Sequence, residues 1–385
     1  MTVTTPRGFR AAGVTAGLKS TGALDLALVV NDGPAHAAAG VFTRNKVKAA
    51  PVLWSQQVLT TGRLRAVVLN SGGANACTGP EGFQTAHATA EKAAEVLGCA
   101  PLEVAVCSTG LIGKQLPRAA VLAGVEAAVA GLGDDAAAAL AAATAIMTTD
   151  TVAKQAAHTA DGWSIGGTTK GAGMIAPSMA TMLTVLTTDA VVDSPVLDEA
   201  LRAAVRVSFD RLDVDGCMST NDTVLVLASG ASGVAADPVV FTEALAAVCR
   251  DLALQMQADA EGVTKRITVR VTGAATEDDA VTVARTIARD SLVKTAIFGS
   301  DANWGRIAAA AGYADAAVDP DRLDITVNGV LLCRGGVAAG GRTDADLSGK
   351  EVLVEVALGL GDGAADILTT DLSHAYVEEN SAYPS

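Results

Sequence analysis

The sequence is short of aromatic, basic and histidine residues, and each shortage excludes a class of protein. Aromatic side chains make up 3% of the 385 residues, so the core is expected to pack through small side chains rather than rings. Lys and Arg total 28 against 42 Asp and Glu, a net charge of -14, whereas a nucleic-acid surface would need a basic stripe. The four histidines include no ligand-spaced pair such as HExxH, so neither a metal nor another cofactor is expected.

Paired cysteines, a membrane-spanning run and a secretion signal are also missing. The six cysteines include no CxxC pair, which is typical of reduced thiols used as small apolar residues. The most apolar Ala-rich window, residues 119–147, is interrupted by Glu126, Asp134 and Asp135, which indicates soluble helices rather than a membrane span. Residues 1–8 contain no basic region followed by an apolar core, so the cytoplasm is the expected location.

What the sequence does contain is abundant apolar material arranged in alternating short strands and helices. Half of the residues are apolar, enough for two domains or for one large intertwined domain. Strand-like runs at 25–31, 37–44 and 65–70 are separated by turns and predict a meander. Helices are predicted at 117–130 and from Asp134, a plausible cap, to about residue 146. The C-terminal tail is expected to be frayed.

A glycine-rich stretch near the middle of the chain is the first candidate for chemistry. A loop beginning at Lys170 runs through Pro177 to Thr181, and an apolar, threonine-rich run that predicts a buried strand begins at Met182. If the bond before Thr181 were cut, that residue would carry both a hydroxyl nucleophile and an amine to act as its base. On spacing alone, an ordinary junction between a loop and a strand explains the pattern better.

Further polar clusters are compatible with either chemistry or simple turns. Val104–Cys107 predicts a buried strand that ends at Ser108-Thr109-Gly110, where the Thr109 hydroxyl and the Gly110 N–H could hold an oxyanion. Residues 147–151 could line a pocket or cap a helix. Residues 213–223 begin like a calcium loop but lack the closing Glu, so they are interpreted as a polar turn beneath a core strand.

These clusters occur in an order that resembles the ornithine acetyltransferase family, also called glutamate N-acetyltransferase. The resemblance covers residues 8–385 and departs locally at Gly73, where Asn is expected, and at Ala302, where Pro is expected. The segments that carry it are Ser108–Gly110, Met147–Thr151, Lys170–Leu183, Ser219–Thr223, Leu292–Thr295, Asn303–Arg306 and the Tyr-Val…Asn-Ser-x-Tyr tail from Tyr376.

The resemblance implies a precursor that cleaves itself between Ala180 and Thr181. Residues 1–180 would then form an α chain and residues 181–385 a β chain that begins with the nucleophile. The implied fold is a layered α/β (α+β) sandwich, like that of the N-terminal-nucleophile hydrolases, built from both chains, with a smaller C-terminal α/β region. The implied assembly is α2β2, with no nucleic acid or membrane as partner.

The resemblance also implies the reaction and the residues that perform it. The acetyl group of N2-acetyl-L-ornithine would pass through an acetyl-Thr intermediate to L-glutamate, recycling acetyl in arginine biosynthesis, with Thr109 and Gly110 as the oxyanion pair. The implied substrate-binding residues are Thr148, Lys170, Thr181, Glu261, Asn380 and Ser385. Whether acetyl-CoA is also a donor stays open. The alternatives are a related amidase or aminopeptidase that uses water as acceptor, and a metabolite-binding or scaffolding protein without activity.

Overall fold

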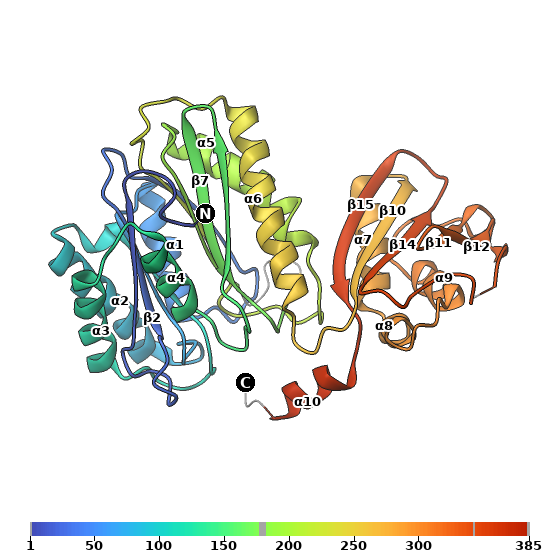
Figure 1. Cartoon of the computed structure of the whole chain (residues 1–385), viewed down its shortest axis with the longest axis horizontal. Coiled ribbons are helices and arrows are strands. Elements are labelled where there is room, and N and C mark those ends of the chain that lie inside the picture. Colours follow the sequence, from blue (N-terminus) through green and yellow to red (C-terminus); the bar gives the residue numbers. More distant parts are fainter. Residues whose placement is uncertain (1, 177–181, 342, 383–385) are drawn as a thin grey trace. The chain divides into compact units, whose positions relative to one another are not determined.

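The computed structural model describes residues 2–176, 182–341 and 343–382, and it divides into two compact units (Figure 1). The first unit runs to Asp210 and also includes Cys217–Met256. The second contains Arg211–Gly216 and the described residues from Gln257 to Ala382. None of the helices in the described part of the chain combines the length and the hydropathy that crossing a membrane requires.

The first unit contains a four-stranded sheet with the order β1-β2-β4-β5. Its strands are β1 (Phe9–Val14), β2 (Leu26–Asn31), β4 (Ala66–Asn70) and β5 (Val104–Ser108). Strands β1, β2 and β4 are antiparallel neighbours, while β4 and β5 are parallel and place Asn70 opposite Ser108. The polar loops that follow β4 and β5 therefore begin at the same edge of the sheet.

The second sheet of this unit has five strands in the order β3-β9-β8-β7-β6. The strands are β3 (Ala37–Phe42), β6 (Lys154–Ala160), β7 (Trp163–Lys170), β8 (Leu183–Thr188) and β9 (Thr223–Ala228). The predicted meander over residues 25–70 is wrong. Strands β2 and β4 pair with each other, whereas β3 belongs to the second sheet and pairs with β9, which is distant in the sequence. Leu183 lies opposite both Lys170 on β7 and Thr223 on β9.

Six α-helices accompany these sheets within the described residues. They are α1 (Ala50–Val58), α2 (Gly79–Leu97), α3 (Arg118–Ala130), α4 (Ala136–Ala145), α5 (Ser194–Arg206) and α6 (Pro238–Ala258). The two helices predicted between residues 117 and 146 are confirmed, but the cap of α4 is Asp135, whose carboxylate accepts the Ala138 N–H at 2.8 Å, and not Asp134. In Figure 1, α6 lies along β7, and the Gly167 backbone of β7 is close to Leu252 on that helix.

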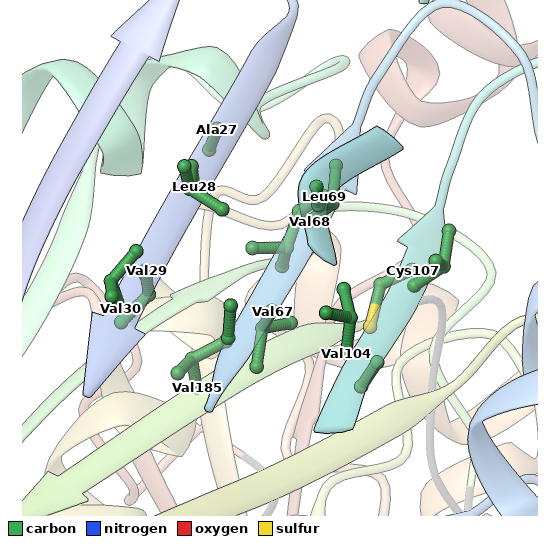
Figure 2. Close-up of a cluster of buried hydrophobic side chains, with 14 of the residues drawn as sticks. Ala27, Leu28, Val29, Val30, Val67, Val68, Leu69, Val104, Cys107 and Val185 are labelled. Atoms are coloured by element: carbon green, nitrogen blue, oxygen red, sulfur yellow. The ribbon is translucent and has the colours of Figure 1, made fainter. Parts of the chain in front are cut away.

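Small aliphatic side chains form the core that joins the two sheets. Val29, Val67 and Val104 from the first sheet share a buried cluster with Val185 of β8 (Figure 2). Each such side chain contributes roughly 1.5–3 kcal/mol when it is fully buried. As expected from the low aromatic content, this core is therefore formed by closely packed small side chains. Gly13 on β1 is an example, because a Cβ there would overlap the Ala141 carbonyl of α4.

The second unit is a smaller α/β region built on a six-stranded sheet of order β13-β12-β11-β14-β10-β15. Its strands are β10 (Arg266–Ala274), β11 (Asp324–Val327), β12 (Val330–Arg334), β13 (Val337–Ala338), β14 (Glu351–Ala357) and β15 (Gly363–Thr370). Its helices are α7 (Glu277–Arg289), α8 (Ser291–Phe298), α9 (Trp304–Gly312) and α10 (His374–Ala382). The expected frayed tail is wrong up to Ala382, because those residues form α10.

The expected layered α/β architecture and the smaller C-terminal α/β region are confirmed. The boundary between the compact units does not coincide with the predicted processing boundary at residues 180 and 181, which stays a prediction. Strands β7 and β8 lie on either side of that bond and pair over six positions, from Ile165 opposite Thr188 to Lys170 opposite Leu183. Both predicted chains therefore contribute to one sheet of the first unit.

Candidate active site

The predicted site residues fall into three groups. Thr109, Gly110, Thr148 and Lys170 lie in the first unit, while Glu261 and Asn380 lie in the second. Three further positions of the prediction lie outside the described residues, namely Ala180, Thr181 and Ser385.

Lys170 is the last residue of β7 and is a fully buried cation. The residue is 1% exposed, and its Nζ donates to Thr109 Oγ1 over 3.4 Å. The same Nζ lies 3.9 Å from Oδ2 of Asp150. A buried ammonium group requires such a counter-charge, because its desolvation otherwise costs several kcal/mol. Two residues that are 61 positions apart in the sequence are thus brought into contact.

Asp150 is the buried anion around which this group is arranged. Its Oδ1 accepts hydrogen bonds from Lys154 Nζ and from the Gly171 N–H, both at 2.7 Å. Its Oδ2 accepts the Thr148 N–H at 3.0 Å. Burial alone would raise the pKa of this carboxyl group, but Lys170, Lys154 and the donated hydrogen bonds outweigh it and lower the pKa to about 2. Asp150 is therefore ionised at neutral pH, and it fixes the backbone at Thr148 and at Gly171.

Thr109 and Gly110 occupy the loop that follows β5. The Thr109 N–H donates to the Asn70 carbonyl at 2.9 Å, and its carbonyl accepts the Gly73 N–H at 3.0 Å. Because Lys170 donates to Oγ1, the hydroxyl proton of Thr109 is directed to another acceptor, as an oxyanion donor requires. Gly110 has a φ of 124°, and a Cβ there would lie 2.6 Å from the Gly73 nitrogen. Only glycine fits this position without strain.

Asn221, two residues before β9 of the second sheet, holds this loop in place. Its Nδ2 donates to the Ala74 carbonyl at 2.6 Å and to the Ser108 carbonyl at 2.8 Å. Its Oδ1 accepts the Thr220 hydroxyl at 2.6 Å. Asn221 is 3% exposed, so these bonds form away from solvent and fix the carbonyl immediately before Thr109.

Glu261 and Asn380 meet within the second unit. Asn380 Nδ2 on α10 donates to Glu261 Oε2 at 2.9 Å and to the Tyr376 carbonyl at 3.0 Å. Gly262 allows this approach, because a Cβ at that position would overlap the Tyr376 backbone. The two predicted substrate-binding residues of this unit are thus in direct contact.

Three residues of the site were not singled out from the sequence. Asp150 lay within the polar run at 147–151 and Asn221 within the polar turn at 213–223, so both had a signal but no assigned role. Lys154 had no signal, because a lysine at the start of a strand usually faces solvent. Here its side chain is fully buried and paired with Asp150.

Comparison with known proteins identifies the family. A model of the ArgJ family matches residues 10–385. The arginine biosynthesis bifunctional protein ArgJ of Mycolicibacterium paratuberculosis is 62% identical over 395 residues, covering 100% of this chain and 96% of the relative. The protein of the same name from Streptomyces coelicolor is 59% identical over 385 residues and 100% of both chains.

A solved structure, ornithine acetyltransferase complexed with ornithine from Mycobacterium tuberculosis, is 61% identical, with a TM-score of 0.45. It covers 47% of this chain and 96% of that chain. The resemblance found in the sequence is confirmed by the family model and by the full-length relatives. The chain belongs to the ArgJ family, the ornithine acetyltransferases of arginine biosynthesis.

Proposed function

We propose that the chain transfers the acetyl group of N2-acetylornithine to glutamate through an ester on Thr181, after the bond between Ala180 and Thr181 has been cleaved. The observation that supports this most directly is the hydrogen bond between Lys170 and Thr109. It joins a buried cation to a hydroxyl that can stabilise an oxyanion. Because the chain belongs to the ArgJ family, the enzyme is an acyltransferase.

In the first half-reaction the α-amine of Thr181 takes the proton of its own hydroxyl, and Oγ1 attacks the acetyl carbonyl carbon. An α-amine has an ordinary pKa of roughly 7.7–8.0, which suits a base and acid near neutral pH. Negative charge develops on the acetyl oxygen, where the Thr109 hydroxyl and the Gly110 N–H donate. One such donor contributes on the order of 3–4 kcal/mol. The amine then protonates the leaving nitrogen, the C–N bond breaks, and ornithine departs.

In the second half-reaction the α-amine of glutamate attacks the ester carbonyl. Its proton passes to the Thr181 amine and then to the departing Oγ1, so that N-acetylglutamate and the free nucleophile result. Both amino acids carry an α-carboxylate. We assign the Lys170 ammonium group as the cation that binds it. Glu261 is assigned to a cationic nitrogen of the substrate. The resemblance to the family further assigns substrate contacts to three residues, Thr148, Asn380 and Ser385.

Formation of the nucleophile requires the Thr181 hydroxyl to attack the Ala180 carbonyl. The peptide becomes an ester, and water then releases the α chain of residues 1–180. Pairing of β7 with β8 supports continued association of the two chains, because their backbone hydrogen bonds do not depend on the cleaved bond. The α2β2 assembly and the cytoplasmic location remain predictions.

A labelled acetyl group distinguishes transfer from hydrolysis. With N2-acetylornithine labelled in the acetyl group and with glutamate present, the label should appear in N-acetylglutamate with no net release of acetate. Double-reciprocal plots should be parallel, because the two substrates use one site in turn. Release of labelled acetate at a rate independent of glutamate would instead support the amidase alternative.

The word bifunctional in the relatives' names supports a second donor. We infer that acetyl-CoA also acetylates Thr181 of this chain, since a thioester carbonyl can be attacked by the same nucleophile. Replacing acetylornithine with acetyl-CoA in the same assay should give N-acetylglutamate and free CoA. Failure to form either product would restrict the chain to the acetylornithine reaction.

A further inference from the structure

A small cavity lies within the second unit, beside the junction of α7 and α8. Its volume is about 210 Å³. Sites for drug-sized ligands typically enclose about 300–1,000 Å³, and one water molecule occupies about 30 Å³, so the cavity suits a small organic molecule. The residues of its wall that matter for recognition are Val214, Asp215, Arg289, Lys294, Asp371 and Leu372, all of which belong to the second unit.

Lys294 on α8 brings a buried cation to this cavity. It is 6% exposed, and its Nζ donates to the Val214 carbonyl at 2.7 Å and to the Thr369 hydroxyl at 3.1 Å. Both acceptors are neutral, and an ammonium group has a third proton to donate. Among the described residues no carboxylate forms an ion pair with this Nζ, and the nearby aspartates act on it only from a greater distance. Because a buried charge is costly unless it is paired, an anion in the cavity would complete this site.

Arg289, the last residue of α7, is the second cation of the cavity. Its Nε donates to Asp213 Oδ2 at 2.6 Å, and no described residue accepts a hydrogen bond from its two Nη groups. Its side chain is 43% exposed, so these groups can be reached by a ligand. A guanidinium group presents its donors in a fixed fork that matches a carboxylate. Ser291, at the N-terminus of α8, also lines the cavity, and the helix dipole favours negative charge there.

Two aspartates on the cavity wall indicate the other end of the ligand. Asp215 and Asp371 line the same cavity as the two cations. The Asp371 carboxylate accepts two backbone N–H groups, at 2.8 and 3.0 Å, and among the described residues no cation forms an ion pair with it. These carboxylates repel a multiply charged anion and attract a positive group. A ligand that carries one charge of each sign is therefore favoured over a simple anion.

We propose that this cavity binds a free α-amino acid. Lys294 and Arg289 bind its carboxylate, and Asp215 and Asp371 bind its ammonium group. An α-amino acid carries both charged groups on one carbon atom, and the apolar residues of the wall accommodate its side chain. The proposal goes beyond acetyl transfer and does not depend on it, because no step of that reaction is assigned to the cavity.

Binding should be accompanied by uptake of protons near pH 8. Burial lowers the pKa of Lys294 to about 8, so part of the population is uncharged at that pH. A carboxylate in contact with Nζ raises this pKa again, and the amine then takes up a proton. Side chains of the other types around it ordinarily titrate well away from pH 8. Those that surround Lys294 are Asp213, Asp215, Asp371, Arg289 and Tyr376.

The test uses the full chain and three small probes. L-norvaline carries both charged groups and an unbranched apolar side chain, its amide lacks the carboxylate, and pentanoate lacks the ammonium group. Titration calorimetry at pH 8, in two buffers of different ionisation enthalpy, measures affinity and proton uptake together. L-norvaline should bind with uptake of up to about half a proton. The amide and pentanoate should each bind about tenfold more weakly or worse.

Three variants locate the bound probe. Lys294→Met should abolish both the binding of L-norvaline and the proton uptake. Arg289→Gln retains the buried lysine and should weaken binding by about tenfold or more. Arg270→Gln is the matched control, because Arg270 also pairs with an aspartate of this unit, Asp366 at 2.9 Å, but lies outside the cavity. Its affinity should equal that of the wild type. Should Lys294→Met fail to fold, Arg289→Gln decides.

Equal affinity for L-norvaline in the wild type and in a folded Arg289→Gln or Lys294→Met chain would overturn the proposal. Failure of the wild type to bind L-norvaline at about 10 mM would overturn it as well. Pentanoate that binds as tightly as L-norvaline would show that the cavity takes a simple carboxylate, and binding without proton uptake at pH 8 would remove Lys294 from the site. None of these outcomes affects the acetyl-transfer proposal, which has its own assay.

Discussion

Lys170 Nζ and Thr109 Oγ1 lie 3.4 Å apart and join the end of β7 to the loop that follows β5. The lysine supplies positive charge, and by donating to Oγ1 it directs the threonine proton outward. Thr109→Ala should therefore lower kcat by about a hundred- to thousandfold without unfolding the chain. Thr109→Ser retains the hydroxyl and should retain most of the activity. Equal loss of kcat in both variants would mean that the hydroxyl is not the oxyanion donor.

Gly110 should tolerate substitution far less well than a neighbouring glycine. A Cβ at Gly110 would lie 2.6 Å from the Gly73 nitrogen, whereas a Cβ at Gly113 would meet no atom within 4 Å. Both residues have positive φ values, 124° and 83°, so Gly113→Ala controls for the backbone cost alone. Gly113→Ala should cost about 1 kcal/mol of stability and keep kcat. Gly110→Ala should reduce kcat sharply, because the clash displaces the oxyanion loop.

Asp150→Asn should destabilise the first unit, because Lys154 and Lys170 lose the negative charge that they share. Removing one partner of a buried ion pair typically costs about 3–5 kcal/mol. Urea unfolding measures this cost. Asp198→Asn is the control, since its pair with Arg202 is solvent-exposed and should contribute less than about 1 kcal/mol.

The same carboxyl group predicts a dependence of stability on acid. The pKa of Asp150 is lowered to about 2 in the folded chain, against roughly 3.9 when unfolded. Its contribution is therefore present above the unfolded value and is lost as pH falls through the folded one. Between pH 4 and 2 the wild type should lose about 2 kcal/mol more than Asp150→Asn. Parallel curves of unfolding free energy against pH would contradict this assignment.

Lys294 predicts a second dependence of stability on pH, at alkaline pH and in the second unit. Its Nζ donates to the Val214 carbonyl at 2.7 Å and to the Thr369 hydroxyl at 3.1 Å. Burial lowers its pKa to about 8, although Asp213 and two further aspartates oppose the shift. From that pH to about 10.4 the unfolded chain binds more protons than the folded one, so stability should rise with pH. The difference in unfolding free energy between wild type and Lys294→Met should grow across this window.

The sequence predicted local elements well but long-range pairing poorly. The spacing of apolar residues predicted helices α3 and α4. The pairing of β3 with β9 was not, because Phe42 and Thr223 are far apart in the chain and no local pattern encodes their contact. Strand β7 was also missed, since all its residues are buried and the glycines Gly166 and Gly167 interrupt any alternation.

Three copies of the tripeptide Thr-Thr-Asp show the same limit for site residues. Asp150 pairs with buried lysines, whereas Asp189 accepts backbone N–H groups from Arg7 and Ser164. Asp371 accepts the Thr264 and Lys265 N–H groups. Identical local sequences thus have different partners, which are set by the fold. The family resemblance predicted the individual candidate site residues, and the structure added Asp150, Lys154 and Asn221 beside those of them that it describes.

Intact-mass measurement of the purified protein, with and without N2-acetylornithine, tests the central claim most directly. Cleavage predicts two chains, residues 1–180 and 181–385, and acetylornithine should add one acetyl group to the N-terminal Thr181 peptide of the second chain. Thr181→Ala should remain a single chain of 385 residues and acquire no acetyl group. A wild-type chain that stays intact, or an acetyl group found on another residue, would contradict the account.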